Sequence, residues 1–385
     1  MTSRTRAFVL AVSIPVIAYV VIGGYLGQAL AKDDTYQHLR VFEDVVSLVL
    51  NNYVEEVDVT VAMKGAMKGL ADGLDPESAY LTPELAKTVQ AADASDVADV
   101  GLAVTRQYYL RIVAAKDGSP GARAGLRSGD FIRAIDNRPT RDMSAYEGAR
   151  LLRGAPGSKV SLLVIRGNAA EPHVVDLVRE RLNGSDLTSR MADASTGYIR
   201  IVEFSKESPA RLKQAIDALA RTKAVRHVID LRGTARGDLD DGIAAARLFV
   251  KSGTLAIRQA KGDQREVITA QPGDGTIVSP VVLLINQGTA GPGEVFAAAL
   301  DDNDRADLVG EQTIGRAARQ RLITLPDGSG LLLSYLRYLT PDGNAIHEKG
   351  LMPDEEVEQP EVEFGAEPPA ADTTLQKALE RISKS

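Results

Sequence analysis

The sequence contains no cysteine and no tryptophan among its 385 residues. Without cysteine, disulfide bonds, thiolate zinc sites and a cysteine nucleophile are excluded. No cluster of lysine and arginine resembles a nucleic-acid footprint, and the formal net charge of −7 argues against a nucleic-acid partner. With 44% hydrophobic and 25% charged residues, the composition is that of a globular protein long enough for about two or three compact units.

The first residues have the pattern of an export signal. Arg4 and Arg6 precede an apolar run over residues 7–31, which ends in the small-x-small sequence Ala29-Leu30-Ala31. This pattern predicts a signal peptide over residues 1–31, or a membrane anchor through residues 7–31 if the leader is not cleaved. In both cases we expect an exported chain, located in the periplasm or on the outer face of the cytoplasmic membrane.

The next two regions differ in their periodicity. Residues 32–95 carry apolar residues at helical spacing and predict an N-terminal helical region, with a short helix expected to start near Thr82-Pro83-Glu84, an N-cap followed by a proline and an acidic residue. Residues 96–168 contain short β-rich runs separated by turn signals, with one helix expected over Ala145 to Leu152. These residues also contain a glycine-rich segment at 118–130 and a Gly-Ala-Pro-Gly turn at 154–157. The order of the strands, these two segments and the helix resembles that of a PDZ domain of the bacterial, protease-associated type.

That resemblance implies a peptide-binding groove. It places a carboxylate-binding loop at Gly101 and Leu102, with Gly101 leaving backbone donors free, and it places Leu151 and Leu152 along the groove. The alternatives are an ordinary turn at Gly101 and two leucines that fill the domain's core.

The remaining chain alternates predicted strands with helices. Residues 169–358 therefore predict an α/β layer architecture. A buried strand is expected over Val281 to Ile285, followed directly by a helix over Gly293 to Leu300. Residues 359–385 are acidic and contain prolines, which predicts an exposed linker and a short C-terminal helix.

Several ordered segments resemble the carboxyl-terminal processing peptidases, a family of serine–lysine endopeptidases with a PDZ domain. Apart from the PDZ region, they are residues 74–80, 197–205, 228–232 and 338–354. The resemblance implies a multidomain α+β and α/β fold, with an N-terminal helical segment, a PDZ domain and an α/β peptidase-like core that has a mixed sheet.

The family's catalytic positions fall on unexpected residues in this chain. The family's nucleophile lies in a segment like Ser-Ala-Ser-Ala-Ser-Glu, and the register ending at Glu294 places Gly291 at the serine position. The family's lysine lies in a segment like Thr-Phe-Gly-Lys-Gly-x-x-Gln, which places Arg316 at the lysine and Gln320 at the glutamine that orients it. One ungapped register from Asn286 to Gln320 contains all these positions.

Each replacement has a chemical consequence. Gly291 has no side chain with which to attack a carbonyl, and Arg316 stays protonated and cannot serve as a general base. Pro292 lacks the backbone N–H that the residue after the nucleophile donates to the oxyanion, a loss of about 3–4 kcal/mol. The second oxyanion segment keeps only Gly237 of its paired glycines and carries the bulky Arg236.

Other chemistry was weighed against these positions. Thr289 is the one alternative nucleophile nearby, and residues 328–330 are more typical of a hairpin turn. The histidines are scattered, and the acidic residues at 238–241 and 301–304 fit a helix N-terminus and a solvated loop, so we expect no cofactor and no metal site. Arg236 and Arg316 either capture a peptide carboxylate or form plain salt bridges.

The sequence leaves three hypotheses for function. In the first, the chain is an exported pseudopeptidase that binds peptide or protein C-termini through its PDZ domain, with an active family peptidase or a second copy of itself as a further partner. In the second, it is an active serine-type endopeptidase that processes C-termini in the cell envelope. In the third, it is a structural assembly protein.

Overall fold

The computed structural model describes residues 37–91, 97–167, 171–182, 184–360, 362–366 and 371–384. The leader predicted over residues 1–31 lies outside these described residues. The chain divides into two units, one ending at Met67 and the other running from Lys68 to the C-terminus. Within the described ranges, no helix is long and apolar enough to cross a membrane.

The N-terminal unit is helical, as its apolar spacing predicted. One helix covers residues 37–52, and α2 (Val59–Asp72) begins after a short break. Large apolar side chains are exposed all along the first helix. The most exposed of them are Leu39, Val41, Val45 and Leu48.

A five-stranded sheet joins segments that are far apart in the sequence. β1 (Ala79–Leu81), β16 (Gly330–Leu339), β11 (Thr254–Ala260) and β12 (Gln264–Thr269) are neighbours in that order, and β15 (Ala318–Thr324) pairs with β16. α3 (Pro83–Gln90) follows β1, with Thr82 as its N-cap and a proline in its first turn, as the sequence predicted. Residues 325–329 form the turn between β15 and β16, and Gly330 begins β16, so the hairpin turn expected at 328–330 is present.

The PDZ domain has its own sheet, in the order β2-β3-β4-β6-β7, with β5 paired to β4. The predicted helix is present as α5 (Ala145–Leu152). β7 pairs with β6 throughout, so the domain extends beyond the boundary expected at residue 168. The other elements of the domain are β2 (Leu102–Gln107), β3 (Tyr109–Ala115), α4 (Pro120–Arg123), β4 (Phe131–Ile135), β5 (Arg138–Pro139), β6 (Lys159–Ile165) and β7 (His173–Val178).

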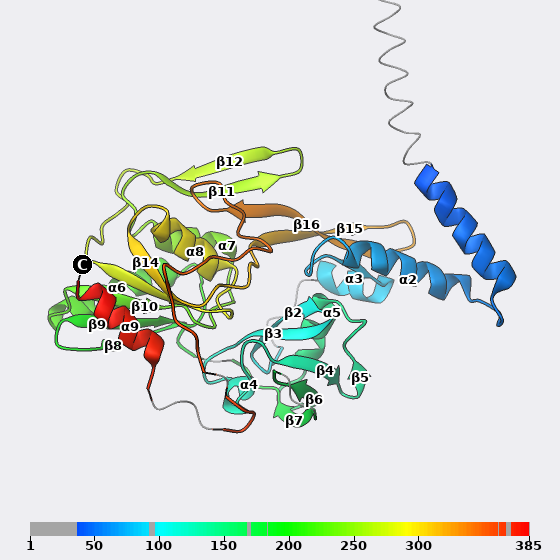
Figure 1. The fold of residues 1–385 in the computed structure, drawn as a ribbon, viewed down its shortest axis with the longest axis horizontal. Helices are drawn as coiled ribbons and strands as arrows, with labels where there is room; N and C mark the ends of the chain where they lie inside the picture. The colour runs from blue at the N-terminus through cyan, green and yellow to red at the C-terminus, as the bar shows by residue number, and fades with distance from the viewer. Residues whose placement is uncertain are drawn as a thin grey trace, which may run out of the picture. The chain divides into compact units, whose positions relative to one another are not determined.

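The peptidase-like core is built on a mixed six-stranded sheet in the order β17-β14-β13-β10-β9-β8 (Figure 1). β8 is antiparallel to β9, and the other pairs are parallel. The strands are β8 (Leu187–Met191), β9 (Thr196–Ile201), β10 (Arg226–Asp230), β13 (Val281–Ile285), β14 (Ala306–Gly310) and β17 (Glu355–Glu356). The mixed sheet expected from the resemblance is therefore confirmed.

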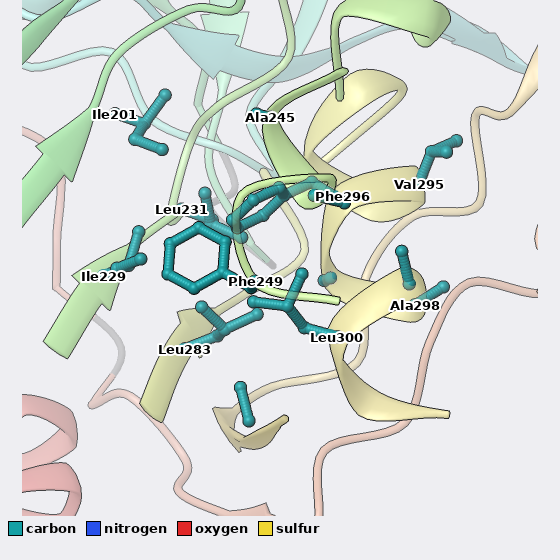
Figure 2. Close-up of a cluster of buried hydrophobic side chains, with 14 of the residues drawn as sticks. Ile201, Ile229, Leu231, Ala245, Phe249, Leu283, Val295, Phe296, Ala298 and Leu300 are labelled. Atoms are coloured by element: carbon teal, nitrogen blue, oxygen red, sulfur yellow. The ribbon is translucent and has the colours of Figure 1, made fainter. Parts of the chain in front are cut away.

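Helices cover both faces of this sheet. α6 (Ser208–Arg221), α7 (Leu239–Ala246) and α8 (Pro292–Asp301) pack on one face, and α9 (Thr373–Ile382) packs on the other. Figure 2 shows Phe249 and Phe296 between the strands and α8, with Leu283 and Leu300 beside them. Every residue from Pro292 to Leu300 is buried, so the start of α8 is fixed by packing on all sides.

The C-terminal linker is less exposed than predicted. Phe364 packs against the PDZ core cluster, stacks on His173 with ring centroids 4.6 Å apart, and lies beneath Arg166 at 5.1 Å. The expectation of a purely exposed linker was wrong at this point, because one aromatic residue in the acidic sequence finds an apolar and cationic surface. The predicted terminal helix is present as α9.

Candidate active site

A tight turn lies between β13 and α8. Its last residue, Gly291, has φ 58° and ψ −117°, a conformation that strains any residue with a side chain. Strained strand-to-helix turns of this kind present the nucleophile in many hydrolases. A β-carbon at Gly291 would lie 3.6 Å from the Arg316 carbonyl oxygen and 3.9 Å from a Leu239 methyl carbon, which are ordinary contacts. The turn thus has room for a side chain that the sequence does not supply.

Glu294 joins this turn to the segment that carries Arg316. Its fully buried carboxylate accepts hydrogen bonds from the amides of Gly291 at 3.0 Å, Gly315 at 2.6 Å and Arg316 at 2.8 Å. The Thr313 hydroxyl also donates to it. Burial raises the pKa of Glu294, and the donated hydrogen bonds act in the opposite direction. The carboxylate therefore holds the two predicted catalytic positions together.

The Arg316 guanidinium is already paired. Its Nη2 lies 3.0 Å from Oε2 of Glu77, a buried carboxylate that also accepts a hydrogen bond from the Thr105 hydroxyl at 2.7 Å. The salt bridge, one of the two alternatives for Arg316, is therefore present. Sequence reasoning did not identify Glu77 as a site residue, although it lies in the family-like segment 74–80.

Gln320 lies on β15 and belongs to a different network. Its amide donates to the Ser334 hydroxyl and to the Ala318 carbonyl, each at 3.2 Å. The Ser334 hydroxyl donates in turn to Asp75 at 3.2 Å. Asp75 also accepts the amides of Glu77 and Ser78, each at 2.8 Å. The segment 74–80 thus contacts two of the predicted site positions. Glu77 pairs with Arg316, and Asp75 is linked to Gln320 by the Ser334 hydroxyl.

The predicted oxyanion region has one remaining candidate donor. Pro292 has no N–H, as its sequence dictates. Gly237 has φ 117°, and a β-carbon there would lie 2.2 Å from the Phe204 carbonyl oxygen, so only glycine fits. The preceding side chain, Arg236, reaches the PDZ domain and pairs with Asp99 at 3.0 Å.

Thr289 is poorly suited to replace the missing serine. Its side chain is fully buried, and its hydroxyl donates to the Leu231 carbonyl at 2.8 Å. The same hydroxyl accepts the Asn286 amide at 3.1 Å. A hydroxyl held by two backbone groups inside the turn has no access to a substrate, so its role here is structural.

The four predicted peptide-binding residues divide into two groups. Leu102 and Leu152 are buried in the PDZ core cluster, and Leu151 is partly buried at its margin. The Gly101 amide is not free, because it donates to Asp99 Oδ1 at 2.9 Å, which corrects the expectation of open donors at this glycine. Gly101 is required for packing, since a β-carbon there would overlap Ser119 at 2.1 Å. Among the described residues, β2 is an edge strand of the PDZ sheet and pairs with β3, which is the kind of edge to which a PDZ domain adds a ligand strand.

Acidic residues elsewhere have structural roles. Among the described residues, no group of histidine, aspartate and glutamate side chains could hold a metal ion. Asp238 is the N-cap of α7, which agrees with the expectation that these acidic residues lie at a helix N-terminus, and Asp240 pairs with Arg258 and Arg319. At the end of α8, burial and four neighbouring aspartates raise the pKa of Asp301 to about 7.

We expect Asp301→Asn to stabilise the protein above pH 7. The raised pKa means that the folded state holds a proton which the unfolded state releases near pH 3.8, so this group's contribution to stability falls as the pH rises from 3.8 to about 7. After allowance for solvent screening of this half-buried group, the gain at alkaline pH should be about 1–2 kcal/mol.

Urea denaturation across this pH range measures the effect. The gain should shrink towards acidic pH, where Asp301 is protonated in the folded protein. The exposed Asp142→Asn is the control and should change the unfolding free energy by less than about 0.5 kcal/mol. A gain for Asp301→Asn that does not vary with pH would contradict the assignment.

Comparisons with known proteins agree with this architecture. Residues 111–166 match the PDZ domain model, and residues 195–357 match the model of peptidase family S41. A solved structure described as the photosystem II D1 C-terminal processing protease superposes with a TM-score of 0.70 at 27% identity. That superposition covers 82% of this chain and 86% of the other.

Curated relatives extend the similarity over nearly the whole sequence. A carboxyl-terminal-processing protease of Synechocystis is 35% identical, covering 91% of this chain and 83% of the relative. The CtpA carboxy-terminal processing protease of Bacillus subtilis is 30% identical, covering 87% and 72%. With the PDZ domain, the mixed-sheet core and the turn before α8 arranged as described, the chain belongs to the carboxyl-terminal-processing protease family.

Proposed function

We propose that this family member is a pseudopeptidase that binds peptide or protein C-termini through its PDZ domain. The observation that carries the proposal is the turn at Gly291, which has space for a nucleophile and no side chain to fill it. The pairing of Arg316 with Glu77 adds support, because a guanidinium held by a carboxylate cannot accept a proton. Binding to the PDZ domain requires none of the missing groups.

An active endopeptidase is the second candidate. The names of the relatives favour it, since those proteins are called proteases. Activity in this chain would need a nucleophile other than the residue at 291, and the hydroxyl of Thr289, two positions before it, is buried and bonded. The pseudopeptidase is therefore the better supported proposal for this chain.

Export and self-association are further parts of the proposal. The apolar run at residues 7–31 supports an exported location, in the periplasm or on the outer face of the membrane. Leu39, Phe42, Val46 and Val49 alternate at spacings of three and four residues on the first helix, as in a coiled-coil seam. This seam supports pairing with a second copy or with an active peptidase that has a similar helix.

The proposal predicts binding without cleavage. Short peptides with apolar C-termini should bind the chain with micromolar dissociation constants, about −8 kcal/mol, and mass spectrometry after long incubation should recover them intact. Isothermal calorimetry measures the binding. Shortened peptides would favour the endopeptidase, and an absence of heat with every peptide would favour the structural assembly protein.

A further inference from the structure

Arg236 connects the peptidase core to the PDZ domain. It lies in the loop between β10 and α7, where the family resemblance places an oxyanion segment. Its Nη2 donates to Asp99 Oδ2 at 3.0 Å and to the Leu102 carbonyl at 3.4 Å. Leu102 is the first residue of the edge strand β2. A core side chain thus reaches the end of the strand on which a PDZ domain receives its ligand.

The guanidinium has unused binding capacity. It carries five N–H donors, and among the described residues its Nε and Nη1 have no partner. The side chain is 25% exposed, so solvent and ligands can reach it. Asp99 Oδ1 accepts the Gly101 amide, and Asp99 Oδ2, which Arg236 contacts, also lies 3.8 Å from Arg153 Nε. The Nε and Nη1 groups of Arg236 are therefore the donors that a ligand could use.

The charges along β2 have a direction. Arg236 lies at the start of the strand, while Thr105 and Arg106 near its end contact the carboxylates of Glu77 and Asp72. A peptide added antiparallel to β2 would place its C-terminus beside Leu102 and its preceding residues towards Arg106. Arg236 then lies beside the C-terminal carboxylate of the peptide, whereas Glu77 and Asp72 lie beside the uncharged backbone of its preceding residues.

We propose that Arg236 completes a binding site for the α-carboxylate of a peptide, so that the PDZ domain and the core hold the C-terminus together. This inference rests on the proposed peptide-binding function. Arginine suits the role because its planar fork binds a carboxylate through two N–H groups. Arg236, the bulky residue in the segment that resembles the family's oxyanion loop, would then take part in peptide recognition.

The test compares free-acid and amidated forms of the same peptides. A pool of short peptides ending in Ala, Leu, Val or Phe is titrated into the full chain, and the affinity ratio of acid to amide is the readout. In the wild type the acid should bind about tenfold or more tightly than the amide, as expected for hydrogen bonds to a charged group. In Arg236→Gln the ratio should fall towards one, while affinity for the amide stays unchanged.

Two further variants separate this role from a plain salt bridge. Asp99→Asn keeps an oxygen for the Gly101 amide and removes the competing charge, so it should tighten binding of the free acid by about threefold. A structural tie between Arg236 and Asp99 predicts weaker or unchanged binding instead. Arg265→Gln removes an exposed arginine that pairs with Asp263 and is the matched control; thermal unfolding verifies that each variant is folded.

The outcomes are distinguishable. If neither form of any peptide binds the wild type, the proposed function fails and this inference fails with it. If acids bind more tightly than amides and Arg236→Gln preserves the ratio, peptide binding stands and the role of Arg236 is wrong. Equal binding of acids and amides by the wild type also overturns the carboxylate site without overturning peptide binding.

Discussion

The combined variant Gly291→Ser, Pro292→Ala and Arg316→Lys should gain cleavage of unfolded protein, at a rate about a hundredfold or more above that of the wild-type chain. The serine supplies the nucleophile, the alanine restores a backbone N–H for the oxyanion, and the lysine supplies a general base. The turn has space for the first change, because a β-carbon at Gly291 makes only ordinary contacts of 3.6 Å and longer, although the positive φ of 58° strains the serine backbone.

The pH profile of this variant is a sharper expectation than its rate. Glu77 lies against the side chain at position 316 and would hold a lysine there in its charged form, which raises the lysine pKa. Cleavage should therefore rise with pH through the alkaline range. Adding Glu77→Gln removes that carboxylate and should move the rise to lower pH.

The single changes are the controls for this experiment. Each should stay at the wild-type background, because a nucleophile without a base and a base without a nucleophile both leave the mechanism incomplete. If the combined variants are folded, bind peptide and still do not cleave, the loop that carries Arg236 and Gly237 has also lost its oxyanion geometry.

Glu294→Ala should destabilise the protein by about 3–5 kcal/mol, the largest stability effect that we expect of one substitution. Removing the carboxylate leaves the amides of Gly291, Gly315 and Arg316 and the Thr313 hydroxyl without their acceptor in a fully buried site. It also leaves a cavity between two segments that this carboxylate joins.

Urea denaturation measures this loss, with Glu266→Ala as the matched control. The Glu266 side chain is 66% exposed and pairs with Arg258 at 3.0 Å, so its removal should cost less than about 1 kcal/mol. The loss of stability for Glu294→Gln should lie between those of the two alanine variants. The glutamine side chain keeps the volume and one acceptor oxygen, but its NH2 group, a donor, would face N–H or O–H donors. A change below about 1 kcal/mol for Glu294→Ala would show that the carboxylate does not hold the two segments together.

Local sequence patterns predicted the elements that carry the site. The apolar run at 281–285 predicted the strand, and the pattern over 293–300 predicted α8 to within one residue of its start, because these features depend on neighbouring residues. The same holds for Thr82 as an N-cap and for α5 in the PDZ domain.

Contacts between distant segments were not predictable in this way. Nothing local to Arg316 indicates that Glu77 neutralises it, and nothing local to Arg236 indicates that it reaches Asp99 in another domain. The Phe364 contact with the PDZ domain was missed for the same reason, since composition described the segment as polar. These pairings are set by tertiary packing, so a single sequence carries no periodic signal for them.

The role of Thr289 also required the fold. In the sequence it was a hydroxyl two positions before Gly291, and only the turn geometry shows that the Leu231 carbonyl and the Asn286 amide hold it. Asp75 accepts the 77–78 amides, which fixes the local turn that carries Glu77, and Glu77 pairs with Arg316.

The most direct test of the central claim is covalent labelling of the full chain with a fluorophosphonate probe, followed by peptide mapping and by incubation with unfolded protein. We predict no adduct on any residue of the chain and no cleavage above the blank, because position 291 carries no hydroxyl. Mapping the adduct to this chain excludes a contaminating protease. A stoichiometric adduct on a residue near the turn at Gly291, together with cleavage that stops when that residue is replaced, would contradict the account.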